Sequence, residues 1–96
     1  MEKILFTLFV TGQTSRSQTA ISNLRQICRQ LPANQCKVTI VDVLERPHLA
    51  EEFKVIATPT LLKRGAGPPR RIVGDLSDQK QVLHWLGLID LAINMD

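Results

Sequence analysis

Apolar residues follow two different spacings in the first half of the chain. Residues 4–10 are apolar except for Thr7, and this short continuous run predicts a strand buried on both faces, as in a parallel sheet covered by helices. From residue 20 to residue 31 the apolar positions recur at helical spacing, which predicts an amphipathic helix that ends near Pro32. Residues 38–43 predict a second strand. Together these segments predict a right-handed βαβ unit with parallel strands.

The second half of the chain predicts a short helix, two strands and a final helix. Pro47 suits the first turn of the short helix. Residues 60–63 and 71–73 predict antiparallel strands, joined by the breaker loop 65–69. Ser77 is expected to cap the last helix. The residues of this helix that are expected to face the core are Val82, Leu83, Leu86, Ile89 and Ile93.

Side chains near the helix starts refine this assignment. Ser15 and Gln18 have the spacing of a capping box at the start of the first helix. In the short helix, the residues expected to face the sheet are Leu49, Ala50 and Phe53.

Pro59 stands directly before the third predicted strand. A residue that precedes proline is driven towards extended backbone, and an X–Pro bond is where a cis peptide costs little. We therefore expect a sharp corner at Pro59. The resulting order, βαβαββα with proline at the entrance to the third strand, predicts a thioredoxin-like α/β fold in a single domain, residues 1–96.

Composition and charge narrow the classes of function. With 96 residues, of which 44% are apolar, the chain is large enough for one core. The net charge of +3 favours acidic partners, but the basic residues are scattered and aromatics make up only 4%, which argues against nucleic-acid binding. The N-terminal apolar run is too short for a membrane span and lacks a signal-peptide pattern, so we expect a cytoplasmic protein without a membrane partner.

The chemistry-bearing residues do not form a catalytic pattern. Cys28 and Cys36 are the only cysteines, and without a CxxC motif they predict buried thiols rather than a disulfide scaffold or a zinc site. Thioredoxin chemistry needs a cysteine at the start of the first helix, whereas the loop at residues 11–17 has none. His48 and His84 lack neighbours at metal-ligand spacing. We expect a protein that is not an enzyme and holds neither metal nor cofactor.

Four segments resemble the KaiB family of circadian clock proteins. They are Leu-Phe-Val-Thr-Gly-Gln-Thr at 8–14, the acidic and apolar stretch 41–52, Ala-Thr-Pro-Thr-Leu at 57–61, and Pro-Pro-Arg-Arg-Ile-Val-Gly-Asp-Leu-Ser at 68–77. The resemblance covers nearly the whole chain. The sensor domain of the histidine kinase SasA is related, but the segment 70–77 looks more like KaiB itself.

The resemblance implies a binding protein with two folds. Members of the family typically rest as tetramers in a βαββααβ fold, in which residues after about 50 are rearranged; whether this chain forms a tetramer or a dimer is left open. The resemblance implies that the ATPase ring of KaiC captures a minor thioredoxin-like form, which recruits KaiA and competes with SasA. Two alternatives are a paralogue that works with KaiC in stress adaptation and a SasA-type sensor module without clock function.

The resemblance also assigns roles to individual residues. Lys63, Arg70 and Arg71 match basic positions of the family, and Lys54 joins them from the short helix, so all four are candidates for partner contact. The simpler interpretation of the two arginines is a solvated strand edge.

Residues 82–93 are so evenly apolar that periodicity does not separate a helix from a strand. Gly87 within a helix would cost up to about 1 kcal/mol relative to alanine, and isomerisation at proline would slow a rearrangement. An ordinary core helix is the simpler alternative. The residues that we assign to fold switching are Pro59, Pro68, Pro69, Trp85, Gly87 and Asp90.

Overall fold

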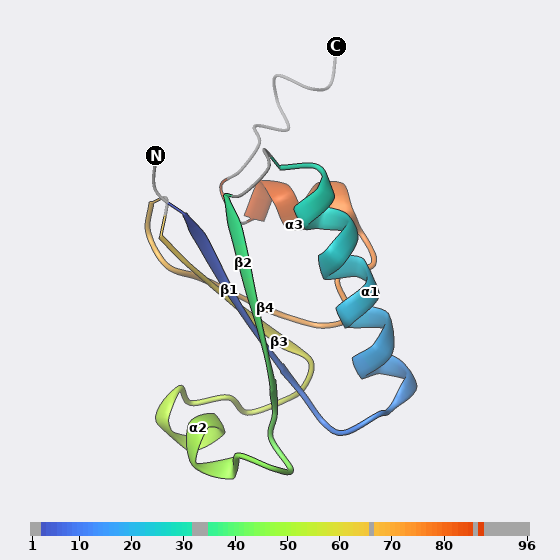
Figure 1. The fold of residues 1–96 in the computed structure, drawn as a ribbon, viewed down its shortest axis with the longest axis vertical. Coiled ribbons are helices and arrows are strands. Elements are labelled where there is room, and N and C mark those ends of the chain that lie inside the picture. The colour runs from blue at the N-terminus through green and yellow to red at the C-terminus, as the bar shows by residue number, and fades with distance from the viewer. Residues whose placement is uncertain (1–2, 32–34, 66, 86, 88–96) are drawn as a thin grey trace.

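The computed structural model describes residues 3–31, 35–65, 67–85 and 87 (Figure 1). Its elements are β1 (Ile4–Val10), α1 (Ser15–Arg29), β2 (Cys36–Asp42), α2 (Pro47–Glu52), β3 (Thr60–Arg64), β4 (Arg70–Val73) and α3 (Gln79–Trp85). The predicted order βαβαββα is therefore confirmed. Asp90 and three residues of the predicted last helix, Leu86, Ile89 and Ile93, lie outside the described residues.

The four strands form one mixed sheet in the order β2-β1-β3-β4. β1 is parallel to β2 and antiparallel to β3, and β4 is the antiparallel return of β3 at the sheet edge. Figure 1 shows α1 and α3 on one side of the sheet and α2 near the opposite side, at the end where β1 and β2 finish. The sheet therefore lies between a larger and a smaller helical layer.

The main core lies between the sheet and the layer of α1 and α3. Alternate residues of β1 point into it, because side chains of a strand alternate between the two faces. Its buried members are Ile4, Phe6, Leu8, Val10, Ala20, Leu24, Ile27, Leu61, Ile72, Leu76, Val82 and Leu83.

The opposite face of the sheet has a smaller core under α2. Phe9, Val41 and Leu62 are buried there, and residues from α2 and the segment after it pack on them. Leu5 lies on the same face but is 38% exposed. The prediction that β1 is buried on both faces is thus wrong for its first half, because the six residues of α2 cover only one end of the sheet.

Both predicted helix caps are one residue away from the observed caps. α1 is capped by Thr14, whose hydroxyl accepts the Ser17 N–H at 3.2 Å, so the predicted Ser15 capping box is not formed. α3 is preceded by Asp78, whose Oδ1 accepts the Gln81 N–H at 3.1 Å. In both cases the residue next to the predicted cap accepts the backbone N–H instead. Both side chains can accept such a hydrogen bond, so the local sequence does not decide which of the two caps the helix.

The first helix and the corner before β3 otherwise agree with the sequence. α1 ends at Arg29, with Gln30 as its C-cap, shortly before Pro32. The Thr58–Pro59 peptide bond is cis. The Thr11 and Thr58 hydroxyls are hydrogen-bonded to each other, which joins the loop after β1 to the segment before β3.

A test of the fold uses Gly65, which follows β3 at a φ of +77°, where a Cβ atom would lie 2.3 Å from the backbone oxygen of Lys3. Gly65→Ala is therefore expected to lower the free energy of unfolding by about 1–3 kcal/mol more than Gly74→Ala does. Gly74 is the matched control, because it also has a positive φ, +131°, but nothing lies within 4 Å of its added Cβ. Urea denaturation followed by circular dichroism measures both; equal losses would contradict the close packing.

Candidate partner-binding site

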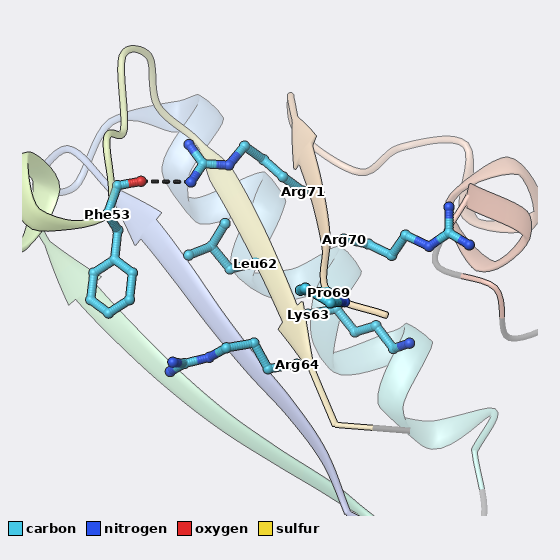
Figure 2. Close-up of a pocket in the computed structure, with 7 residues that line it drawn as sticks. All are labelled: Phe53, Leu62, Lys63, Arg64, Pro69, Arg70 and Arg71. Carbon is cyan, nitrogen blue, oxygen red and sulfur yellow. Dashed lines mark hydrogen bonds between the residues drawn. The ribbon is translucent and has the colours of Figure 1, made fainter. Parts of the chain in front are cut away.

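A hollow of about 300 Å³ lies where β3 and the edge strand β4 meet the end of α2. We call it the basic hollow. Figure 2 shows its lining residues, which are Phe53, Leu62, Lys63, Arg64, Pro69, Arg70 and Arg71. Four of the seven carry a positive charge, so the hollow favours an anionic surface.

The pairing of β3 with β4 decides which side of the sheet each basic residue faces. Leu62 is paired with Arg71, and Lys63 is paired with Arg70. Because successive residues of a strand point to opposite faces, Arg71 lies on the α2 side with Leu62, whereas Lys63 and Arg70 lie on the α1 and α3 side. Figure 2 shows Arg71 extending towards Phe53 and Arg70 extending the other way. The four predicted contact residues therefore do not form one patch.

Arg71 fastens the edge strand to the end of α2. Its guanidinium donates one hydrogen bond to the Lys54 carbonyl oxygen at 2.8 Å and another to the Phe53 carbonyl oxygen at 2.5 Å. The last carbonyl groups of a helix lack partners within the helix and carry partial negative charge. Arg71 satisfies two carbonyls just beyond α2, so it has a structural role beside any contact with a partner.

Lys54 occupies the residue at which the chain turns away from α2. Its φ is +55°, its N–H donates to the Glu51 carbonyl at 3.1 Å, and the Val55 N–H donates to the Ala50 carbonyl at 2.8 Å. This pair of bonds is the Schellman arrangement, in which glycine is the usual left-handed residue. The Lys54 side chain is exposed, so the turn presents its ammonium group to solvent.

Arg64 is a basic residue of this face that the sequence analysis did not select. Its guanidinium carbon lies 5.4 Å from the centroid of the Phe53 ring, which is itself 5.8 Å from the ring of Phe9. A cation over an aromatic face is attracted by the ring quadrupole. The sequence did contain a signal for Arg64. It lies two residues after Leu62, and residues two apart in a strand point to the same face of the sheet. Arg64 and Arg71 thus both contact Phe53, and Lys54 follows it in the chain.

Lys63 differs from the other three predicted contact residues because it is buried. Only 1% of its surface is exposed, whereas Lys54, Arg70 and Arg71 are exposed. Burial lowers the pKa of the Lys63 ammonium group, since the charged form loses hydration, and the charge of Arg70 lowers it further. In this conformation Lys63 belongs to the interior beside Arg70.

The residues assigned to fold switching occupy three separate places. Pro59 is buried at the entrance to β3, and Pro68 and Pro69 are exposed in the loop before β4. Trp85 is the last residue of α3 and is 53% exposed. Gly87 lies just beyond α3 at a φ of +77°, with its N–H bonded to the His84 carbonyl at 2.9 Å. The expected cost of glycine within a helix therefore does not arise in this conformation, because Gly87 follows the helix end.

The two cysteines lie far from the loop that carries thioredoxin chemistry. That loop follows β1, whereas Cys28 is in the last turn of α1 and Cys36 begins β2, at the opposite end of the sheet. Across the described ranges, no three His, Cys, Asp or Glu side chains are grouped so as to hold a metal ion. None of the described helices is long and apolar enough to cross a membrane.

Comparisons with known proteins agree on one family and one fold. A family model described as the KaiB domain matches residues 7–88. Circadian clock protein KaiB3 of Synechocystis sp. is 44% identical over 89 residues, which cover 93% of this chain and 87% of that protein. Circadian clock oscillator protein KaiB of Trichodesmium erythraeum is 43% identical over 89 residues, which cover 93% and 86%.

Two solved structures describe the fold. The N-terminal domain of Synechococcus elongatus SasA matches with a TM-score of 0.73 at 28% identity, over 94% of this chain and 89% of that domain. Chloroplastic thioredoxin z matches with a TM-score of 0.74 at 24% identity, over 90% and 77%. The expected thioredoxin-like fold is therefore confirmed.

A test of the site compares the two adjacent arginines. Arg71→Ala removes two charge-assisted hydrogen bonds to the end of α2, so it is expected to lower the free energy of unfolding by about 1–2 kcal/mol. Arg70→Ala is the matched control and is expected to change it by less than about 0.5 kcal/mol, as for an exposed side chain away from such contacts. Urea denaturation measures both. Equal effects of the two substitutions would contradict the role of Arg71.

Proposed function

The chain belongs to the KaiB family of circadian clock proteins, and from this membership we propose that it is a regulator that binds the ATPase ring of KaiC. Binding would modulate the phosphorylation state of KaiC or its output signalling. The observation that carries the proposal is the match of the KaiB domain to residues 7–88, together with relatives named as clock proteins over 93% of the chain. No catalytic step by this chain is part of the proposal.

The thioredoxin-like conformation supports a role for this form in docking. It has the shape of the SasA N-terminal domain, with a TM-score of 0.73. Two domains of one shape suit competition for one surface of a partner. We therefore propose that this form engages KaiC, that the complex recruits KaiA, and that a SasA-type kinase competes with it.

The side of the sheet that α2 covers carries positive charge that suits an acidic partner surface. Arg64 is exposed there over the Phe53 ring, and Lys54, which is also exposed, follows Phe53 in the chain. Arg71 completes the basic set, although its guanidinium also holds the end of α2. Complementary charge mainly raises the rate and specificity of association. We propose Lys54, Arg64 and Arg71 as one contact group. Arg70 and buried Lys63 lie on the α1 and α3 side of the sheet, outside this contact group.

Fold switching is proposed for the half of the chain after about residue 50. Among the described residues, the βαβ unit before it supplies seven of the twelve buried members of the main core, and the half after it supplies Leu61, Ile72, Leu76, Val82 and Leu83. Burying one such side chain is worth about 1.5–3 kcal/mol. An alternative packing of this half, βαββααβ in order, would therefore have to bury these five side chains about as well. The free protein in that packing would be a tetramer or a dimer.

Two other functions remain within the family. Identity is 44% to a KaiB3 and 43% to a KaiB, so this measure does not separate a clock component from a paralogue that acts with KaiC in stress adaptation. The similarity to SasA favours a sensor-like module as the second candidate. A KaiC-dependent complex with KaiA would favour the clock role over both.

The proposed function is tested by mixing the protein with KaiC and ATP and following the size of the complex by gel filtration over hours. A complex that forms slowly is expected, because the competent form is a minor part of the population. Lys54→Glu with Arg64→Glu should weaken binding by about tenfold or more, because two of the three charges in the contact group are reversed. Arg25→Glu, an exposed change on α1, is the matched control and should leave binding nearly unchanged. Absence of any complex would overturn the proposal.

Fold switching is tested by NMR of the free protein. Two sets of backbone resonances are expected for residues after about 50 and one set before, because only the second half changes its pairing. Trp85 gives a convenient indole signal within the switching half. A single set throughout, from a form that binds KaiC immediately and completely, would contradict switching while leaving KaiC binding intact.

A further inference from the structure

Cys28 and Cys36 are brought together at one end of the sheet. Cys28 lies in the last turn of α1 and Cys36 is the first residue of β2, and Figure 1 shows these two ends close to each other. Their side chains are close enough for each thiol to shift the pKa of the other. Both are free thiols, half-buried, and both pack against the main core. The sequence predicted buried thiols, and the structure shows them half-buried at the same end of the sheet.

The backbone on each side of the pair is held by the core and by hydrogen bonds. Ile27, which precedes Cys28, is fully buried in the main core. Cys36 is in register with Ile4 of β1, and the Ile4 N–H donates to the Gln35 carbonyl at 2.7 Å. The two cysteines thus lie at the same end of the sheet because α1 runs back along β1 and β2 starts beside the strand on which α1 packs.

We propose that Cys28 and Cys36 are a redox modification site, at which a small-molecule disulfide converts the two thiols into a reversible intramolecular disulfide. The new bond would tie the end of α1 to the start of β2. The proposal does not depend on KaiC binding. Both cysteines precede residue 50, in the half that we expect to keep its structure.

The reaction balances as two successive thiol–disulfide exchanges with glutathione disulfide. In the first, one protein thiolate attacks a glutathione sulfur, which forms a mixed disulfide and releases one glutathione thiolate. In the second, the other protein thiol loses its proton and attacks the protein sulfur, which releases the second glutathione. Two electrons pass from the protein thiols to glutathione disulfide, and the two protons end on the two glutathione thiols.

The environment of the pair sets how readily the thiols ionise. Burial raises the pKa of both groups, and the proximity of Cys28 contributes to raising that of Cys36 to about 12. Either thiol therefore forms a thiolate less readily than an exposed cysteine does, so the exchange is expected to be slow near neutral pH.

The test exposes the folded wild-type protein to glutathione buffers of increasing oxidation, followed by acid quenching and alkylation. Trypsin cleaves after Arg29, so it separates residues 26–29, which contain Cys28, from residues 30–37, which contain Cys36. The two peptides are expected to remain joined before reduction, in a monomer whose mass has fallen by two hydrogen atoms. Cys28→Ser and Cys36→Ser each remove one partner and should yield at most a mixed disulfide with glutathione.

The same titration in urea provides the control for chance encounter of the thiols. If the fold brings the sulfur atoms together, the disulfide should form in the folded protein with an equilibrium constant at least about tenfold above that of the unfolded chain. Thiols that stay reduced in the folded protein would overturn the proposal. Disulfides only between chains, or an equilibrium constant no higher than in urea, would overturn it as well. KaiC is absent from this experiment, so its outcome is separate from that of the proposed function.

Discussion

The central strand β1 is the constraint on which the rest of the fold depends. It pairs with β2 on one edge and with β3 on the other, so its backbone hydrogen-bonding groups are used on both sides. Its alternating side chains also supply both cores, with Leu8 fully buried towards α1 and Phe9 fully buried towards α2. Because this one strand joins two cores of unequal size, the two faces of the sheet are covered to different extents.

The larger face is closed by α1 and holds most of the apolar residues, whereas the smaller face is only partly closed by α2. This difference leaves space for basic side chains around Phe53, and it explains why the candidate site lies there. Arg71 donates a hydrogen bond to the Phe53 carbonyl oxygen, and the Arg64 guanidinium lies over the Phe53 ring. The charged surface is thereby positioned by the same residue that completes the smaller core.

The distribution of buried residues shows what the proposed switching between two folds would have to replace. A native domain is stable by only about 5–15 kcal/mol. The elements after residue 52 are short, with five residues in β3, four in β4 and seven in α3. Among the described residues, this half holds six of the fifteen buried apolar side chains, so a regrouping around an unchanged βαβ unit would have to restore a comparable burial. Membership of the KaiB family and similarity to the SasA domain are the observations that motivate the proposed switching.

The sequence by itself determined the order of the elements, the family and the corner at Pro59. These features depend on local spacing and on backbone preferences that act within a few residues, so they can be predicted without knowing the contacts. The absence of cysteine from residues 11–17 is equally a property of the sequence.

Only the tertiary structure decided which residues meet. The register of β3 with β4 separated Arg70 from Arg71, and the limited cover by α2 exposed Leu5. The path of α1 back along β1 brought Cys28 and Cys36 to the same end of the sheet. Each of these results requires residues far apart in the chain to be aligned, and a shift of one residue in a strand reverses the face of every side chain.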